Sequence, residues 1–408
     1  MSVVNSFIKY FKSSIFRTVL SFFSAILLAG YLGAEARGLL GIITALSVFA
    51  AFFCSFGLPQ IMSVKYQALK NNLNRIILTF LVAIFCICLL VFIYFFDDPA
   101  LIIISITLSI SALCIMLSRE FLRGANNFTI ISKSIYTEGY VVIICAVITI
   151  IMQFNLINYL VLFTALNLAL SVYLVFKAVI IFRKNRIYEE KIKNKTQLRY
   201  TATNFLIPMA QQSPILIAGI LSFDAVLIGV FALASGLIKN MESIPNAITQ
   251  VLLPHAKESK ETRYISILII TIMFNIIFSI LVFTFVKTLI TPLLPEEFSS
   301  LSQFFAILSI GYVFASNSKV LNIAFNLANR EDYETKGALL RVILQSSFIL
   351  LTYESIGIYS ALIGIALSQI LRFCYTVFCF ASLFKINFSS EFKSAKKIID
   401  TAYARLFK

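Results

Sequence analysis

Three basic side chains fall well inside long apolar stretches of the sequence, away from their ends: Lys239, Arg372 and Lys319. Lys239 and Arg372 lie about halfway along their stretches, and Lys319 lies roughly seven residues, or about 10 Å of helix, from the middle of its own. An ionisable group near the centre of a bilayer costs about 3 to more than 10 kcal/mol, so it usually faces a wet cavity or a partner. In a cavity, an arginine fork and two lysine point charges would bind an anion such as a pyrophosphate.

Ion pairing between helices is the alternative explanation for these charges. Glu242 follows Lys239 by three residues, so the two share one helical face and can neutralise each other without any ligand. Glu242 is also the acidic residue placed deepest inside an apolar stretch, whereas Glu138 lies close to the end of one. Because a carboxylate within the membrane can exchange a proton or bind Na⁺, Glu242 is a candidate coupling site.

Two prolines six residues apart interrupt another apolar stretch, in the segment NFLIPMAQQSP. Pro208 and Pro214 each remove a backbone donor and clash with the preceding turn, so we expect a bend or an interruption between them. Gln211 and Gln212 lie between the prolines and are suited to line such a break. Broken helices are typical of transporter binding sites and gates, while a kink buried by neighbouring helices is the alternative.

The sequence carries no pattern typical of an enzyme or of a cofactor site. It lacks a glycine-rich nucleotide loop, a His and Cys set with metal-ligand spacing and a hydrolytic triad, and its one histidine is His255. All seven cysteines fall within apolar stretches, which disfavours disulfides and metal sites. We therefore expect a protein that is not an enzyme, with no cofactor and no metal.

Twelve apolar stretches are long enough to cross a bilayer as helices, which takes roughly 20 residues each. They predict an all-α integral membrane protein and leave no segment for a separate soluble domain. The predicted spans are 14–31, 39–61, 76–96, 101–121, 135–152, 157–182, 201–221, 225–253, 265–290, 301–327, 337–353 and 356–383.

The distribution of basic residues predicts the orientation of these spans. If the N-terminus is cytoplasmic, the outer gaps hold only Arg37 and Lys287 of the 34 lysines and arginines. Such asymmetry is the pattern of the positive-inside rule, so both termini are expected in the cytoplasm. Anionic headgroups of the inner leaflet then account for the formal charge of +15, with no nucleic acid required.

The longest polar gap divides the chain into two halves of six spans each. We predict an N-terminal half at 1–182, a cytoplasmic linker at 183–200, a C-terminal half at 201–384 and an amphipathic cytoplasmic tail at 385–408. Ala29-Gly30 and Glu35-Ala36 correspond to Ala218-Gly219 and Asp224-Ala225 at a constant offset of 189. This weak repeat is typical of transporters that arose by duplication, and it places a central cavity between the halves.

The N-terminal half is the poorer of the two in buried charge. Arg17, Lys177 and Arg341 lie within a turn or two of predicted cytoplasmic ends, where long side chains normally extend to the headgroups. In the N-terminal half, only Arg17 and Arg119 are placed to contribute cations to a cavity, so Arg17 joins the candidate substrate-binding residues.

Three short motifs resemble those of bacterial polysaccharide flippases. The turn Tyr31–Leu39 (YLGAEARGL) is similar to the family's LG-x-E-x-(F/R)-G junction between its first two helices. Ser55–Pro59 (SFGLP) and Phe121–Phe128 (FLRGANNF) resemble its (D/S)-x-G-L and L-x-R-A-x-x-x-F segments. That family shares a superfamily with the multidrug and toxin extrusion proteins, and twelve spans fit its O-antigen members.

The resemblance implies a function. The chain would move a polyprenyl-pyrophosphate-linked oligosaccharide from the cytoplasmic to the periplasmic leaflet of the bacterial inner membrane by alternating access. Membrane lipids, H⁺ or Na⁺ and other polysaccharide-assembly proteins are the further partners that it implies. The low charge of the N-terminal half departs from flippases that have a cationic cavity on both sides.

Two other functions stay open. A drug or cation exporter of the same superfamily would need acidic rather than basic charge in its cavity. A membrane polymerase or glycosyltransferase for lipid-linked sugars usually needs a large outer loop with catalytic residues, and the longest loop predicted here is cytoplasmic.

Overall fold

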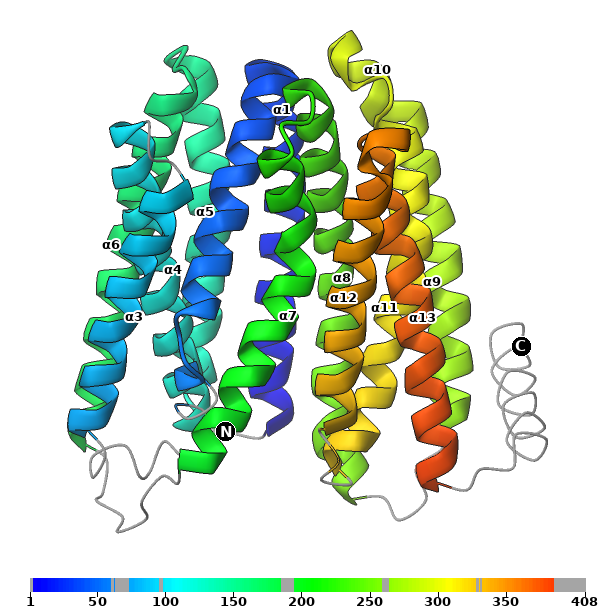
Figure 1. Cartoon of the computed structure of the whole chain (residues 1–408). Coiled ribbons are helices and arrows are strands. Elements are labelled where there is room, and N and C mark those ends of the chain that lie inside the picture. Colours follow the sequence, from blue (N-terminus) through cyan, green and yellow to red (C-terminus); the bar gives the residue numbers. More distant parts are fainter. Residues whose placement is uncertain are drawn as a thin grey trace, which may run out of the picture. The chain divides into compact units, whose positions relative to one another are not determined.

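The computed structural model describes residues 3–59, 62, 73–94, 98–184, 194–258, 264–327, 330 and 332–384, and these residues form helices joined by short turns, without strands (Figure 1). The predicted tail, 385–408, and residues 185–193 of the predicted linker lie outside these residues. The elements are α1 (Val3–Phe53), α3 (Leu73–Tyr94), α4 (Pro99–Gly124), α5 (Phe128–Ile151), α6 (Leu156–Lys184), α7 (Asn194–Ile220), α8 (Ala225–Glu258), α9 (Tyr264–Phe285), the π-helical turn η3 (Val286–Ile290), α10 (Thr291–Leu293), the 3₁₀ turn η4 (Glu296–Phe298), α11 (Leu301–Leu327), α12 (Asp332–Ile356) and α13 (Tyr359–Phe384).

Each of the twelve predicted spans falls on a described helix, which confirms the all-α membrane fold. Within the described ranges, nine helical segments are long and apolar enough to cross a membrane, and one of these, Lys9–Phe53, contains the first predicted span and residues 39–53 of the second. Large apolar side chains are exposed on many helices, for example Leu351 on α12 and Phe378 on α13. Such exposure suits a lipid environment, and the chain is a multi-pass membrane protein.

Helix ends agree with local capping signals. Asp98 accepts hydrogen bonds from the backbone amides of Ala100 and Leu101, and Pro99 occupies the first turn of α4, where its missing N–H costs nothing. Asn127 caps α5 by accepting from the amide of Ile130 at 3.4 Å. These caps place the start of each helix a few residues before the predicted apolar span.

The first two predicted spans form one continuous element with a break at a single residue. Gly33 has φ 81° and ψ 174° inside α1, so the chain leaves helical geometry there and resumes it at Ala34. The gap predicted between residues 31 and 39 is therefore wrong in extent. Arg37, which was expected in that gap, lies in the second helix of α1. That helix also ends at Phe53, before the predicted end at Ile61, and a turn with positive φ at Phe56 and Gly57 follows it.

Two compact units make up the chain. Unit 1 contains residues 1–240 together with Leu294–Phe298, and unit 2 contains residues 241–293 and 299–408. In unit 1, α1 packs against α4, α5 and α7, and α4 packs against α6. In unit 2, α11 packs against α9 and α13, and α12 packs against α13. The two sequence-related halves remain a prediction, because the contacts divide α8 between the units and group α7 with α1.

Close backbone approach explains several glycines of unit 1. A Cβ on Gly38 would lie 2.6 Å from the carbonyl oxygen of Ala225, and a Cβ on Gly229 would collide with the carbonyl of Ala34. A Cβ on Gly41 would lie 2.5 Å from the Cβ of Ala232. The second helix of α1 and the first turns of α8 therefore form a seam that only small residues permit, as is usual for helix pairs in membranes.

Candidate functional site

Lys319 and Glu242 form an ion pair in unit 2. Lys319 Nζ on α11 lies 2.8 Å from Glu242 Oε2 on α8, and the two side chains keep about a fifth to a quarter of their surface exposed (24% and 20%). Two of the residues predicted for different roles, substrate binding and coupling, are thus brought into direct contact. Such a pair can hold the helices together, position a charge or respond to a proton, and the geometry alone is compatible with each.

Arg341 is buried on α12, with 8% of its surface exposed. In the orientation that satisfies both groups, the amide oxygen of Gln369 on α13 lies within 3.1 Å of all three guanidinium nitrogens. Gln369 is itself buried, with 3% exposed. The sequence placed Arg341 near a cytoplasmic end and suggested that it extends to the headgroups. That expectation is wrong, because the side chain is enclosed between helices.

Arg372 completes this group of charges in unit 2. It lies half-buried on α13, and its Cγ is 3.7 Å from the position that a Cβ on Gly337 of α12 would occupy. Gly337 lies one turn before Arg341 on α12, and Gln369, the partner of Arg341, lies three residues before Arg372 on α13, so both arginines belong to the same contact between α12 and α13. Glu334 of α12 accepts from Asn322 Nδ2 of α11 at 3.0 Å, and Asn322 lies one turn after Lys319. Three cations and two carboxylates therefore lie near one another in one unit and leave a net positive charge. We call Lys319, Arg341, Arg372, Glu242 and Glu334 the unit 2 charge cluster.

Lys239 lies in unit 1 and bonds to a residue of the proline-rich helix. Its Nζ donates to Gln212 Oε1 of α7 at 3.0 Å, and Gln212 is buried with 6% exposed. Gln211 is exposed and does not share this position. The structure thus places together two residues, Lys239 and Gln212, that the sequence linked to substrate binding on separate grounds.

Pro208 and Pro214 both lie inside α7 and are buried. The helix continues through both, so the chain is not interrupted between them, and the bend that was the other expectation stays a prediction. Membrane helices tolerate proline in this way, because other groups can satisfy the backbone carbonyls that proline leaves without a donor.

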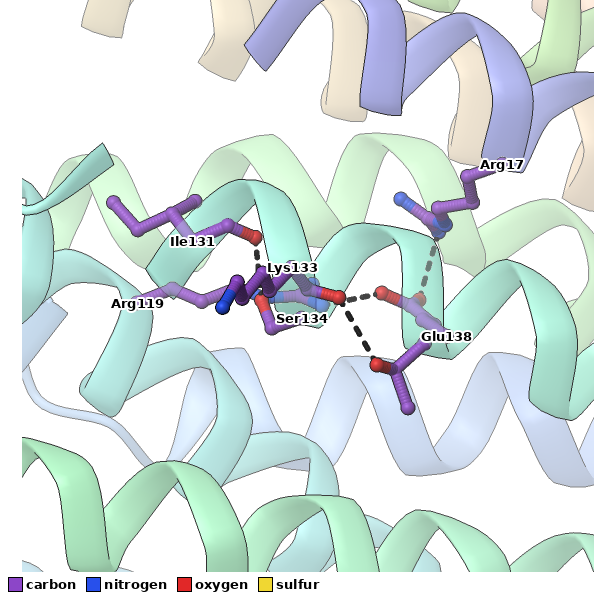
Figure 2. Close-up of polar contacts among 7 residues, drawn as sticks. Arg17, Arg119, Ile131, Lys133, Ser134 and Glu138 are labelled. Atoms are coloured by element: carbon purple, nitrogen blue, oxygen red, sulfur yellow. Dashed lines mark hydrogen bonds and ion pairs between the residues drawn. The ribbon is translucent and has the colours of Figure 1, made fainter. Parts of the chain in front are cut away.

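Unit 1 contains a second charge cluster, formed by Arg17, Arg119 and Glu138 (Figure 2). Arg17 Nη2 of α1 lies 3.0 Å from Glu138 Oε1 of α5, and Arg119 Nη2 of α4 lies 2.7 Å from Glu138 Oε2. Arg119 Nε also donates to Ser134 Oγ at 3.0 Å. One carboxylate therefore joins three helices and leaves one net positive charge, with the Arg17 side chain 45% exposed.

Replacing Glu138 with alanine is expected to destabilise the protein by about 1–3 kcal/mol, because Arg119 loses its anion while 17% exposed. Arg17→Ala should cost less, since an exposed partner contributes about 0–1 kcal/mol. Thermal unfolding of the detergent-purified variants measures both changes. Equal losses for Glu138→Ala and Arg17→Ala would contradict the central role of the carboxylate.

Arg37 is the cation that the sequence analysis placed in the wrong environment. It lies on the second helix of α1, and its Nε is buried without a hydrogen-bond partner among the described residues. One of its terminal nitrogens is 3.6 Å from the position of a Cβ on Gly236 of α8. The sequence does contain a signal for the buried position of Arg37. Arg37 follows the helix-breaking Gly33 by only four residues, in a stretch otherwise rich in small and apolar residues.

No protein-family model and no curated protein sequence matches the chain. Solved structures do match it over most of its length. MurJ, a lipid II flippase in an inward closed conformation, has a TM-score of 0.66 at 14% identity, and the alignment covers 95% of this chain and 90% of MurJ. An inward-facing multidrug resistance MATE family transporter of the MOP superfamily has a TM-score of 0.65 at 14% identity, covering 91% and 96%.

A third structure is a MOP superfamily transporter from Pyrococcus furiosus whose binding pocket is described as having reversed polarity, with a TM-score of 0.53 at 12% identity and coverage of 94% and 96%. The chain has the fold of these membrane transporters. At such low identity the likeness concerns the fold alone, and the expected motifs of the polysaccharide flippases are neither supported nor opposed by it.

Proposed function

We propose that the protein is a flippase that moves a polyprenyl-pyrophosphate-linked oligosaccharide, such as an O-antigen repeat unit, across the bacterial inner membrane by alternating access. The observation that carries this proposal is the unit 2 charge cluster, in which three cations and two carboxylates lie on packed apolar helices. An excess of buried cation suits a multiply anionic ligand, because unpaired positive charge in a membrane is costly until an anion binds it.

In this proposal Arg341 and Arg372 bind the pyrophosphate, since a guanidinium offers two parallel donors to a phosphate. Lys319 and Lys239 add point charges, and Arg17 adds a cation in the N-terminal half. Gln211 and Gln212 contact the substrate beside Pro208 and Pro214, where α7 bends as a gate. Glu242 couples the cycle to H⁺ or Na⁺, and its bond to Lys319 makes that coupling depend on the same cluster.

A drug or cation exporter is the second candidate, because structures of MATE transporters share the fold. Such a protein needs carboxylates available to a cationic substrate. The three carboxylates of the two charge clusters already have partners: Glu138 has Arg17 and Arg119, Glu242 has Lys319, and Glu334 accepts from Asn322. This arrangement favours an anionic substrate over a cationic one. A polymerase or glycosyltransferase has no specific observation in its favour.

Loss of the protein is expected to make complete single repeat units accumulate on their polyprenyl carrier at the cytoplasmic leaflet. Flipping leaves the oligosaccharide chemically unchanged, so the units should have full composition and should resist a glycosidase added outside spheroplasts. Mass spectrometry of extracted carrier lipids, before and after glycosidase treatment, measures both properties. Purified protein in liposomes should make units loaded on one leaflet accessible from the other.

Two results would contradict the proposal. Unfinished units on the carrier would show that the protein makes glycosidic bonds. Complete units that are accessible outside but not polymerised would place its action after translocation.

A further inference from the structure

A short segment between α10 and α11 packs on a helix from the other end of the chain. Residues Leu294–Phe298, which we call the strap, belong to unit 1, although the residues on both sides of them belong to unit 2. Two buried apolar side chains hold the strap there, Leu294 with 9% and Phe298 with 0% exposed. Leu294 Cδ2 lies 3.6 Å from the position of a Cβ on Gly30 of α1.

The strap also makes one directional bond, to the break in α1. Glu297 Oε2 accepts from the backbone amide of Ala34 at 2.8 Å, across 263 residues of sequence. Ala34 begins the second helix of α1 after Gly33, so its amide is one of the donors that no turn of the helix itself can satisfy. A carboxylate at this end of a helix is favoured by the hydrogen bond and by the helix dipole. Glu297 thus caps a helix that belongs to the first half of the sequence.

Gly33 makes this contact possible. Its positive φ turns the chain so that the Ala34 amide is exposed, and a Cβ on Gly33 would come within 3.4 Å of Glu297 Oε2. The seam of Gly38 and Gly41 with Ala225, Gly229 and Ala232 begins one turn further along the same helix. The end of α1 near Gly33 is therefore contacted by two segments of the predicted C-terminal half, the start of α8 and the strap.

We propose that the strap is a latch that holds the two halves of the sequence together at this end, and that the Glu297–Ala34 bond breaks when they separate. By the predicted orientation this end faces the periplasm. The inference rests on the proposed function in one respect, since a flippase with alternating access has to open on that side. Leu293 and Ser299, which flank the strap in the chain, belong to unit 2, so a displacement of either flank pulls directly on the strap's contacts with α1.

Thiol labelling in intact cells tests the latch without reference to the substrate. The full-length protein, with its seven cysteines replaced, carries Leu294→Cys as a reporter and Ser299→Cys, in a separate variant, as an exposed reference. Adding Glu297→Ala is expected to raise the rate at which an impermeant maleimide modifies position 294 by roughly fivefold, as lost helix capping predicts. Glu297→Gln keeps an acceptor without the charge and should give a smaller increase.

Glu296→Ala is the matched control, because Glu296 is the neighbouring exposed glutamate and is not part of the cap. It should leave the labelling rate at position 294 unchanged relative to position 299. Equal rates in the Glu297→Ala and Glu296→Ala variants would overturn the latch, whatever the protein transports.

Cross-linking gives a second, independent test. A short cleavable thiol reagent that joins Gly30→Cys to Leu294→Cys should stop export of repeat units, and cleavage should restore it. The control pair Ser24→Cys and Val142→Cys joins α1 to α5 within the first half, where Ser24 Oγ donates to the Val142 carbonyl at 3.1 Å, and its cross-link should not stop export. Normal export with a complete cross-link at 30 and 294 would refute the latch. A deletion strain without accumulated repeat units would refute the flippase, while the labelling result would still decide the latch.

Discussion

Replacing Arg372 or Arg341 with alanine is expected to reduce surface polysaccharide by at least about tenfold while the protein still reaches the membrane. Each guanidinium is proposed to donate charge-assisted hydrogen bonds to the pyrophosphate, and bonds of this kind contribute about 1.5–3 kcal/mol, where 1.4 kcal/mol corresponds to tenfold. Arg341→Lys should retain part of the function, since it keeps the charge but loses the fork. Arg341→Gln should retain less. Quantitative immunoblotting of surface polysaccharide, normalised to membrane-inserted protein, measures these differences.

Lys336→Ala is the appropriate control for this experiment. Lys336 lies on α12 with Arg341 and is largely exposed, with a long contact of 3.8 Å to Asp332 and another of 5.9 Å to the ring of Tyr333. It should export normally, because an exposed pair contributes about 0–1 kcal/mol. Full export by both arginine variants would remove the unit 2 charge cluster from the substrate site, and the proposed function would lose the observation that carries it.

The positions of the helices were predictable because the membrane imposes one requirement on every span. Backbone groups in hydrocarbon must bond within the segment, so an apolar run of sufficient length becomes a helix whatever its neighbours are. The error at residues 32–38 has a physical reason too. The polar residues Glu35 and Arg37 suggested a loop, but a single glycine with positive φ suffices to turn the chain, and the helix resumes at once.

The partners of the buried charges were much less predictable. Sequence spacing shows which residues share a face of one helix, and it therefore suggested Lys239 as the partner of Glu242. That pair stays a prediction, and the structure adds two bonds that spacing does not reveal: Glu242 to Lys319, which lies 77 residues away on α11, and Lys239 to Gln212 of α7. Such pairings depend on which helices pack side by side, and the spacing of residues within one helix does not predict this packing.

Distance from a helix end was also a poor guide to exposure. Arg17 and Arg341 both lie near predicted cytoplasmic ends, yet Arg17 is 45% exposed as a side chain while Arg341 is buried against Gln369. A long side chain reaches the headgroup region only if it projects from the side of its helix that faces lipid. The contact between α12 and α13 determines which side of α12 that is.

The Lys319–Glu242 pair gives the second large effect that we expect. Lys319→Ala removes the cation that lies 2.8 Å from Glu242 Oε2, and removal of one partner of a partly buried pair should destabilise the protein by about 1–3 kcal/mol. Glu242→Ala should cost a similar amount. The double variant should recover most of this loss, because neither charge is then left unpaired, and thermal unfolding in detergent measures the cycle.

Export by the same variants separates a structural pair from a functional one. If Lys319 binds the pyrophosphate and Glu242 couples transport, the double variant should fold with nearly normal stability and still export at least about tenfold less polysaccharide, as the loss of a charge-assisted contact predicts. Glu242→Gln, which cannot ionise, should fail to export as well, whereas Lys319→Arg should export better than Lys319→Gln. Recovery of both stability and export in the double variant would show that the pair only holds α8 to α11. Neither residue would then belong to the substrate site, and the net positive charge that favours an anionic lipid would rest on Arg341 and Arg372 alone.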